Sequence, residues 1–288
     1  MTSPSLPTRA ENGHKGTFGS VCVIGGQRSE DGAVMLGAPT LTANAAMRSG
    51  CGKVMLAMPQ PLVQAGLALA PVVTGVELPV DEVGRLIPSA TIEAIDRHAA
   101  GCRAFVIGPG FGSDWPQQQI VATLLSREDR PVILDADGLN ALAKLPSGQL
   151  ELKAPTIMTP HVGEYKRLAA AAGVASETAQ AVAQAYGCVV VLKSDVTTVS
   201  DGVTTIEECN GSVVLATGGS GDVLAGVIAG LLVQYGVDCI EHLFDAAVLG
   251  VRIHGMAGES FAIDHGNTGM LATDLLGRIP KAIATLRA

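Results

Sequence analysis

The residues best suited to chemistry lie in a glycine-rich turn, Thr217-Gly218-Gly219-Ser220-Gly221-Asp222, that opens a predicted helix. Glycines before a helix N-terminus expose backbone N–H groups and let a phosphate approach closely. A carboxylate beside such a cradle stands where a general base for phosphoryl transfer would act. Asp222 could instead be a first-turn acid that complements the helix dipole. The turn therefore predicts an anion site with Asp222 as catalytic base, with dipole pairing as the alternative.

This turn differs from the common nucleotide-binding loops. No G-x-x-x-x-G-K-[ST] sequence occurs in the chain, and Gly50-Cys51-Gly52-Lys53 lacks the first glycine and the hydroxyl of that motif. The turn does not match the G-x-G-x-x-G sequence of a dinucleotide-binding fold either. Both of those loop types are excluded.

The elements that must position the turn alternate between short apolar runs and longer segments of helical period. The strand candidates are Ser20–Ile24, Lys53–Met58, Ala104–Gly108, Val132–Asp135, Thr156–Thr159, Cys188–Lys193, Thr197–Ser200 and Thr204–Glu207. The last two are separated by Asp201-Gly202, a hairpin signal. The helix candidates are Met35–Arg48, Thr91–Ala100, Gln117–Leu125, Leu139–Leu145, Val162–Ala171, Ser176–Tyr186, Asp222–Tyr235 and His242–Glu259.

Most of the apolar runs are continuous rather than alternating, so the sheet must be covered on both faces. The order of elements predicts an α/β fold, a three-layer αβα sandwich with a mostly parallel central sheet. No linker divides the chain, so we expect one domain over residues 14–288, preceded by a flexible N-terminal segment, 1–13.

Small, polar and titratable residues follow the predicted strands. The segments are Gly108–Gly112, Asp135–Asn140, Thr159–Glu164 and Lys193–Thr197. In an open parallel sheet the ligand lies beyond the carboxyl ends of the strands. We therefore expect one large site at that edge.

Composition limits the partners of the chain. Its 288 residues carry a formal charge of −8, and 48% are hydrophobic, 16% charged and 3% aromatic. These values exclude intrinsic disorder, and with no basic cluster they argue against a nucleic-acid or membrane surface. The six cysteines are scattered and form no C-x-x-C pair. This pattern is typical of cysteines that act as small buried apolar side chains in a protein of the reducing cytosol. With no signal peptide or membrane-spanning run, we expect a cytoplasmic protein.

The motifs together resemble a known family. Gly218-Gly219-Ser220-Gly221-Asp222 at the head of a late helix resembles the anion hole and catalytic aspartate of the ribokinase-like superfamily. Within that superfamily, six further segments resemble the ADP/ATP-dependent NAD(P)H-hydrate dehydratases, the C-terminal half of a bifunctional repair protein. They are His14–Gly19, Gly37–Pro39 with Arg48–Gly50, Gly108–Gly110, Asp135–Asn140, Thr159–Glu164 and Lys193–Thr197. The resemblance covers nearly the whole chain from His14 onward.

The resemblance implies a ribokinase-like fold and a repair reaction. It implies dehydration of the S epimer of hydrated NADH or NADPH (NADHX, NADPHX), with ADP converted to AMP and phosphate. Asp222 would take the proton of the ring hydroxyl, and the N–H groups of Gly219, Ser220 and Gly221 would stabilise the transferring phosphoryl group. Mg²⁺ would bridge the nucleotide phosphates without a dedicated protein cage. The preference between ADP and ATP stays open.

The resemblance also assigns binding residues. The nucleotide would contact Lys193, Ser194, Asp195, Val196, Thr197 and Gly221, and NAD(P)HX would contact Ala38, Gly110, His161 and Asp222. Ser194 stands where the family commonly has glycine. Asp137 and Asn140 would orient phosphates or metal, with helix capping at Asp137 as the alternative. His14 and Lys15 would close over the ligand or pack on a neighbouring subunit.

Two other functions stay open at this stage. The first is a small-molecule kinase of the same superfamily, of the thiazole or hydroxymethylpyrimidine type, which would also use Asp222. The second is a nucleotide-sensing module without turnover. The family further implies a partner NAD(P)HX epimerase, as a separate chain or an absent domain, and a homo-oligomer up to a tetramer. We expect His98, His242, His254 and His265 to be surface or core histidines, and Trp115 to serve packing.

Overall fold

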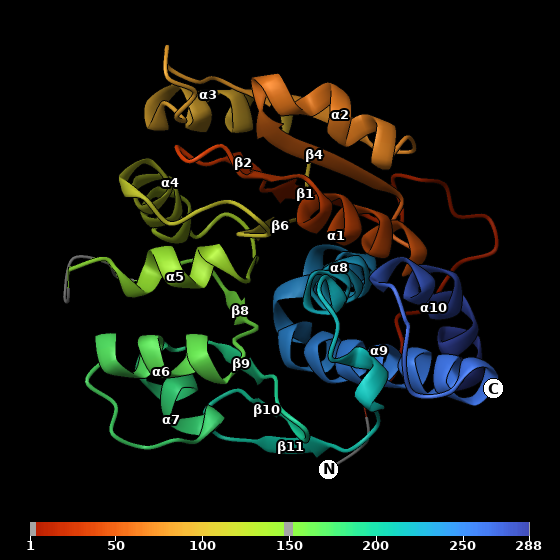
Figure 1. Ribbon diagram of the computed structural model, residues 1–288. Helices are drawn as coiled ribbons and strands as arrows, with labels where there is room; N and C mark the ends of the chain where they lie inside the picture. Colours follow the sequence, from red (N-terminus) through yellow and green to blue (C-terminus); the bar gives the residue numbers. More distant parts are fainter. Residues whose placement is uncertain (1–3, 147–151, 288) are drawn as a thin grey trace.

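The computed structural model describes residues 4–146 and 152–287, so that residues 1–3 of the expected N-terminal segment lie outside it. A nine-stranded sheet runs through it in the order β11-β10-β9-β8-β7-β6-β1-β4-β5 (Figure 1). Its strands are β1 (Ser20–Ile24), β4 (Lys53–Pro59), β5 (Thr74–Leu78), β6 (Ala104–Ile107), β7 (Val132–Leu134), β8 (Thr156–Met158), β9 (Val189–Leu192), β10 (Thr197–Ser200) and β11 (Thr205–Glu208). In this spatial order, every neighbouring pair from β9 across to the edge strand β5 is parallel, including the pairs of β1 and β4. Strand β10 runs antiparallel to both β9 and β11. The predicted α/β class and mostly parallel sheet are confirmed.

Helices cover both faces of this sheet. They are α1 (Gly37–Arg48), α2 (Val63–Leu69), α3 (Pro88–His98), α4 (Trp115–Leu125), α5 (Asp137–Ala143), α6 (Val162–Ala171), α7 (Ala179–Tyr186), α8 (Ser220–Leu232), α9 (Leu243–His265) and α10 (Ala272–Arg287). Short elements complete the fold: the 3-10 helices η1 (Gln60–Leu62), η2 (Val213–Leu215) and η3 (Val233–His242), and a hairpin of β2 (Gln27–Arg28) and β3 (Val34–Met35). No helix in these ranges is both long and apolar enough to span a bilayer.

The two faces of the sheet form separate cores, which alternate along each strand. In β1, Cys22 and Ile24 pack with α3 to α7, whereas Val21 and Val23 pack with α1, α8 and α9. Figure 1 shows these two helix layers on either side of the sheet. All five residues of β1 are buried, which is why this strand reads as an unbroken apolar run. The three-layer prediction is confirmed.

Some predicted boundaries were wrong. Met35 belongs to β3 rather than to the following helix, and α8 ends at Leu232, where η3 takes over and kinks at Gly236 (φ 80°). Helix α9 continues to His265, beyond the expected end at Glu259. The strand β5 and the helices α2 and α10 were not predicted.

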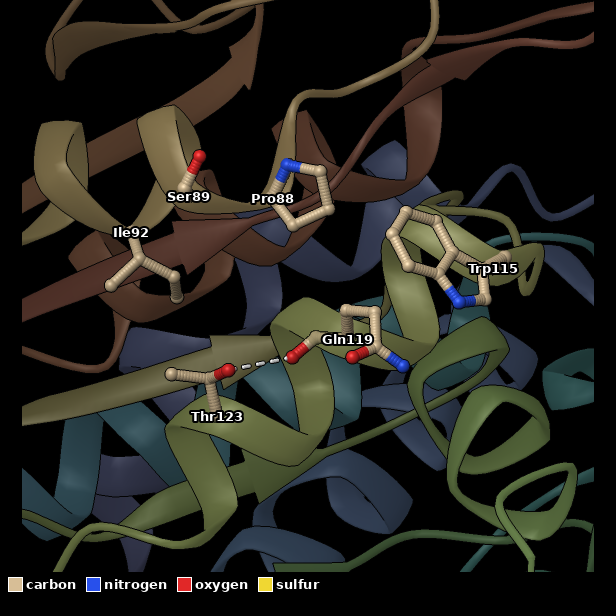
Figure 2. A pocket seen from close by; sticks show the side chains of 6 residues that line it. All are labelled: Pro88, Ser89, Ile92, Trp115, Gln119 and Thr123. Atoms are coloured by element: carbon tan, nitrogen blue, oxygen red, sulfur yellow. Dashed lines mark hydrogen bonds between the residues drawn. The ribbon is translucent and has the colours of Figure 1, made fainter.

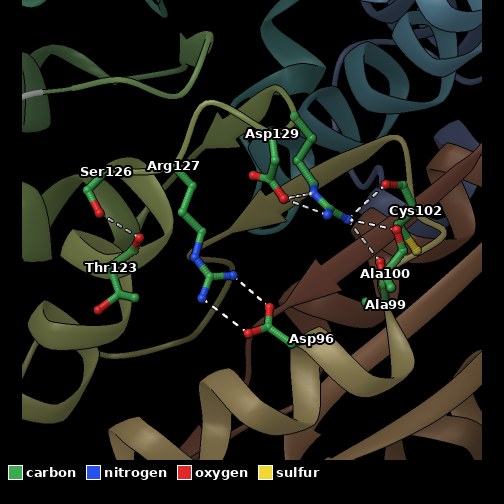
Figure 3. Close-up of polar contacts among 9 residues, drawn as sticks. Asp96, Ala99, Ala100, Cys102, Thr123, Ser126, Arg127 and Asp129 are labelled. Atoms are coloured by element: carbon green, nitrogen blue, oxygen red, sulfur yellow. Dashed lines mark hydrogen bonds and ion pairs between the residues drawn. The ribbon is translucent and has the colours of Figure 1, made fainter.

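The amino edge of the sheet is held together by arginines. Arg127 pairs with Asp96, and Arg130 donates to the carbonyls of Ala99, Ala100 and Cys102, the contacts drawn in Figure 3. These contacts join the segments that lead into β6 and β7. They close the edge of the sheet opposite to the strand ends that carry the predicted site residues.

The N-terminal segment also lies at the amino edge. Arg9 donates to the Gly50 carbonyl and the Gln234 amide oxygen, each at 2.6 Å. The carbonyl of Lys15 lies against Gly52, where a Cβ would be only 1.7 Å from it. His14 and Lys15 thus sit at the far end of the sheet from Asp222, so the expectation that they close over the ligand was wrong for this chain.

A shallow groove separates α3 from α4. It has a volume of about 490 Å³ and is lined by Pro88, Ser89, Ile92, Trp115, Gln119 and Thr123, as Figure 2 shows. Trp115, which we expected to serve packing, is 64% exposed at its rim. The lining has no titratable side chain, so this groove offers no acid–base chemistry.

Candidate active site

A cavity of about 920 Å³ opens where β7, β8 and β9 end, beside the start of α8. Residues 210–217 and part of α9 form its other wall. The titratable side chains that line it are Asp135, His161, Glu164, Lys193, Asp195, Asp222 and His254. The cavity lies at the sheet edge where the strand-end residues led us to expect a site.

Glycines shape the entry to α8. Gly219 precedes the helix in the left-handed conformation (φ 90°), and a Cβ there would lie 2.6 Å from the Leu41 side chain. At Gly221 a Cβ would lie 3.1 Å from Lys193 Nζ. The first position needs glycine for its backbone conformation, and the second lets Lys193 approach the helix start.

The start of α8 presents backbone donors to the cavity. The N–H of Ser220 donates to the Thr217 carbonyl at 3.3 Å, but no described residue accepts from the N–H of Gly219, Gly221 or Asp222. Of the predicted cradle, Gly219 and Gly221 therefore keep their donors available, and the Asp222 N–H is an addition that we did not predict. These groups lie at the positive end of the α8 dipole, which suits an anion.

The pKa of the Asp222 carboxyl lies close to neutral pH. Burial, followed by the negative charge of Asp135, raises the pKa of Asp222 from its usual 3.8 to about 7, against the opposing charge of Lys193. The Thr42 hydroxyl donates to the Asp222 carbonyl at 3.0 Å and fixes this turn of helix against α1. A carboxyl with a pKa near the working pH can serve as a general base.

Lys193 supplies the positive charge of the cavity. Its Nζ donates to Asp135 Oδ1 at 3.0 Å, and the Thr159 hydroxyl donates to the same oxygen at 2.6 Å. Burial alone would lower the pKa of Lys193, but the carboxylates of Asp135, Glu164 and Asp222 outweigh it and raise that pKa. The lysine therefore stays charged beside Asp222.

His161 and Glu164 form a capping box at the start of α6. His161 Nδ1 accepts from the Gly163 N–H at 2.9 Å, and Glu164 Oε2 accepts from the His161 N–H at 2.9 Å. Because Nδ1 accepts, the ring hydrogen lies on Nε2, 3.4 Å from Glu164 Oε1. Burial and then the charge of Lys193 lower the pKa of His161, so the ring is neutral. It lines the cavity as a neutral donor.

The predicted nucleotide segment follows β9. Lys193, Ser194, Asp195 and Thr197 line the cavity, whereas Val196 does not. The Ser194 hydroxyl donates to the Val196 carbonyl at 2.6 Å and so closes a tight turn. The Ser194 side chain thus stabilises the loop that follows β9.

Ala38 and Gly110 lie together, but away from this cavity. A Cβ on Gly110 would be 3.5 Å from the Ala38 Cβ and 3.0 Å from that of Met35. Neither residue is part of the lining that contains Asp222. The structure brings these two predicted NAD(P)HX contacts next to each other, beside the β2–β3 hairpin.

Asp137 and Asn140 bond to protein groups. Asp137 Oδ2 accepts from the Gly112 N–H at 2.9 Å, and its Oδ1 accepts from the Asn140 amide at 3.4 Å. Arg167 donates to the Asn140 amide oxygen at 2.9 Å. Asp137 therefore tethers the Gly112 turn to the start of α5.

The donor set suits a cation that arrives with a ligand. Within residues 4–146 and 152–287, no group of three or more His, Cys, Asp or Glu side chains gathers as a metal cage. The cavity nevertheless has Asp135, Glu164 and Asp222 in its lining. Mg²⁺ usually keeps several waters and binds through one or two carboxylates plus substrate phosphates. The residues present therefore fit a nucleotide-borne Mg²⁺.

Sequence reasoning missed three of the titratable side chains in the lining as site residues, namely Asp135, Glu164 and His254. Asp135 stood in plain view at the end of β7, and its position after a buried strand was the signal. Glu164 was named only as the end of the segment Thr159–Glu164, and nothing in the sequence marked its side chain as part of the site. His254 lies in the middle of an apolar helix and offered no local signal, yet its ring contacts Ser220.

The chain is similar in sequence to proteins that act on NAD(P)H-hydrate. The family model for NAD(P)H-hydrate dehydratase matches residues 21–281. The bifunctional NAD(P)H-hydrate repair enzyme Nnr of Salinibacter ruber is 34% identical over 96% of this chain and 50% of its own length. The ADP-dependent (S)-NAD(P)H-hydrate dehydratase of Neisseria meningitidis serogroup B is 36% identical over 97% of this chain and 88% of its own length. The chain thus spans about half the length of the first bifunctional relatives that it matches.

Solved structures agree with the sequence relatives. The ADP/ATP-dependent NAD(P)H-hydrate dehydratase of Bacillus subtilis, co-crystallised with ATP and Mg²⁺, has a TM-score of 0.76 at 29% identity, over 98% of this chain and 94% of that chain. A ribokinase-like superfamily protein of Enterococcus faecalis has a TM-score of 0.79 at 24% identity, over 98% and 92% of the two chains, and confirms the ribokinase-like fold. The chain belongs to the NAD(P)H-hydrate dehydratase family.

Proposed function

We propose that this chain dehydrates the S epimer of NADHX and NADPHX to NADH and NADPH, with ADP converted to AMP and phosphate. The observation that carries the proposal is Asp222, whose raised pKa of about 7 goes with unpaired backbone donors at the start of α8 and with the charged Lys193. A base, an anion hole and a cation in one cavity are what phosphoryl transfer to a hydroxyl requires. The relatives support the substrate through their names.

The chemistry needs an activated leaving group, because hydroxide leaves poorly. Asp222 takes the proton of the ring hydroxyl, and the hydroxyl oxygen attacks the terminal phosphorus of ADP, which releases AMP. The N–H groups at the start of α8 stabilise the charge on the phosphoryl oxygens, and Lys193 adds its positive charge. The ring nitrogen lone pair then expels phosphate from the neighbouring carbon and forms a C=N⁺ bond. The next ring carbon loses a proton, and its C–H electron pair forms the C=C bond that restores the dihydronicotinamide.

Mg²⁺, when bound with the nucleotide, would neutralise phosphate charge. We assign the nucleotide to the Lys193–Thr197 side of the cavity and the hydrated dinucleotide to Ala38, Gly110 and His161. Asp137 and Asn140 would orient phosphates through the Gly112 turn. ATP could serve as the phosphoryl donor in place of ADP, in line with the name of the Bacillus subtilis relative.

The test is to incubate the protein with NADHX and ADP or ATP, each with Mg²⁺, and to follow the absorbance of restored dihydronicotinamide. Recovery of NADH with stoichiometric AMP and phosphate is expected with ADP. A phosphorylated product without NADH would favour the small-molecule kinase, which the comparisons support less. Nucleotide binding without any product would favour the sensing module.

We also propose the context of the reaction. An epimerase that supplies the S epimer is expected as a functional partner, because relatives of about twice this length are bifunctional repair enzymes. One sheet connects residues 20–208, which supports a single domain over 14–288. The six cysteines are all unpaired, which fits a cytoplasmic location. A homo-oligomer is expected, and light scattering would test it.

A further inference from the structure

His254, which the proposed reaction does not use, lies against the start of α8. It comes from the middle of α9 and lines the cavity together with Ser220. Its Nε2 is 3.0 Å from the Ser220 hydroxyl oxygen and 3.0 Å from the Ser220 carbonyl oxygen. Only 8% of His254 and 4% of Ser220 are exposed. The contact is thus a buried one between a titratable ring and a residue of the predicted anion hole.

The carbonyl contact fixes the tautomer of the ring. A carbonyl oxygen can only accept a hydrogen bond, so Nε2 must be the donor. Burial lowers the pKa of His254 to about 4, and the neutral ring carries a single N–H hydrogen. That hydrogen is shared between the carbonyl and hydroxyl oxygens of Ser220, and Nδ1 has none.

The tautomer sets the direction of the Ser220 hydroxyl. Because Nε2 carries its hydrogen, it cannot accept from the hydroxyl, whose oxygen is the acceptor in this contact. No other described residue pairs with that hydroxyl, so its hydrogen is free to point into the cavity. The N–H groups of the next two residues in the chain, Gly221 and Asp222, are likewise without a protein acceptor.

The position of His254 is itself fixed by the packing of α9. A Cβ on Gly255 would lie 2.4 Å from the Asn210 carbonyl oxygen, so the helix touches the cavity wall at that point. Glu259 Oε1 accepts from the Gly211 N–H at 2.9 Å, one turn further along. The ring is therefore held by a helix that packs directly on the loop of residues 210–217, in the same wall of the cavity.

We propose that His254 is a positioning residue that turns the Ser220 hydroxyl toward the transferring phosphoryl group. The hydroxyl then adds a side-chain donor to the backbone donors of the anion hole. A donor oriented before the reaction stabilises the developing charge without reorganisation. This inference rests on the proposed function, because it directs the hydroxyl to the phosphoryl group of that reaction.

Kinetics of four variants test the proposal. Ser220→Ala should lower kcat on the order of 100-fold, and His254→Met about tenfold, with little change in the KM for ADP. His254→Gln, whose amide N–H can donate to the same oxygens, should keep most of the activity. The fourth variant combines His254→Met with Ser220→Ala. Its kcat should equal that of Ser220→Ala alone, because the ring acts through the hydroxyl. Equal losses in His254→Gln and His254→Met, or fully multiplied losses in the double variant, would overturn the proposal.

A second measurement does not depend on turnover. Nitrogen-15 NMR of the histidine rings in the unchanged protein should place the His254 hydrogen on Nε2, and Ser220→Ala should shift that resonance. A hydrogen on Nδ1 would overturn the proposal even if NADHX is converted. Failure of the unchanged protein to form NADH, with the Nε2 hydrogen in place, would contradict the proposed function alone. Thermal unfolding of each variant identifies any that fail to fold, and the NMR result then decides.

Discussion

Lys193 Nζ and Asp135 Oδ1 lie 3.0 Å apart, although the two residues follow strands separated by β8. Asp135 is 1% exposed, so its carboxylate depends on this lysine and on Thr159 for its partners. The pair ties the ends of β7 and β9 together and places a positive charge beside Asp222. One ion pair thus serves the fold and tunes the proposed base.

Lys193→Met should weaken ADP binding and raise the pKa of Asp222. Loss of the cation removes a partner for the nucleotide phosphates and raises the pKa of Asp222 further, because Lys193 opposes that rise. We expect at least tenfold weaker ADP binding by calorimetry, and a loss of about 3 kcal/mol in stability, because the buried Asp135 carboxylate loses its counter-ion. Lys166→Met, on the exposed side of α6, is the control and should change neither. An unaltered affinity for ADP would exclude Lys193 from the nucleotide site.

The rate should depend on pH through Asp222. The base must be ionised, and its pKa in the free protein is about 7. The value of kcat/KM should therefore rise about tenfold per pH unit below 7 and level off above it. Stopped assays between pH 5 and 9 measure this profile. A flat profile over that range would contradict Asp222 as the base.

Asp222→Asn should remove activity and add stability at alkaline pH. Loss of a general base costs kcat on the order of 1,000-fold, whereas ADP affinity should stay nearly unchanged. The folded pKa lies above the ordinary 3.8, so the stability due to protonated Asp222 is complete below pH 3.8 and is lost as pH rises through about 7. The free energy of unfolding of the variant, measured by denaturant titration, should then exceed that of the unchanged protein by on the order of 2–4 kcal/mol at pH 8 and match it near pH 4. Asp274→Asn, an exposed first-turn acid of α10, should show neither effect.

Ala136→Gly should stabilise the protein. Ala136 is the one non-glycine residue in the described ranges with positive φ (48°, with ψ −118°), and it sits between Asp135 and Asp137 at the cavity. Relief of that strain should raise stability by about 1 kcal/mol in denaturant unfolding. Ala284→Gly, in the exposed part of α10, should instead lower it by about 0.5–1 kcal/mol. A loss of stability in both variants would show that the Ala136 backbone is unstrained.

Gly255→Ala should disturb the loop across the cavity from α8. The added Cβ would meet the Asn210 carbonyl oxygen at 2.4 Å, a backbone atom that can only move with its loop. We expect the KM for ADP to rise about tenfold, while kcat changes less, since overpacking of this size costs about 1–3 kcal/mol. Gly277→Ala on α10, where a Cβ meets nothing within 4 Å, is the matched control. An unchanged KM would show that the 210–217 loop does not hold the nucleotide.

The sheet could be predicted because most of its strands are buried on both faces. β1 and β6 are buried along their whole length and read as continuous apolar runs. β5 lies at the sheet edge, where Thr74 is exposed, and its mixed pattern gave no strand signal. Helix α10 contains Pro280, which breaks the helical pattern although packing on α9 supports the helix. Edge position and tertiary contact are the information that a single sequence lacks.

Part of the site could also be predicted from the sequence, and part could not. Lys193 could be placed because a parallel sheet gathers its strand ends at one edge. Its pairing with Asp135 joins residues 58 positions apart, and that of His254 with Ser220 joins residues 34 positions apart. The first contact depends on the order of the strands in the sheet, and the second depends on the packing of α9 against α8. The role of His254 therefore became visible only in three dimensions, whereas Asp135 could have been found from its position after a buried strand.

The lining of the cavity contains more carboxylates than cations. Asp135, Glu164, Asp195 and Asp222 face a single lysine, Lys193. A nucleotide that arrives with a divalent ion brings positive charge into this surplus, whereas a freed phosphate ion meets only repulsion beyond the lysine and the backbone donors. In the proposed reaction, the acidic lining would thus drive product release and discourage the reverse reaction.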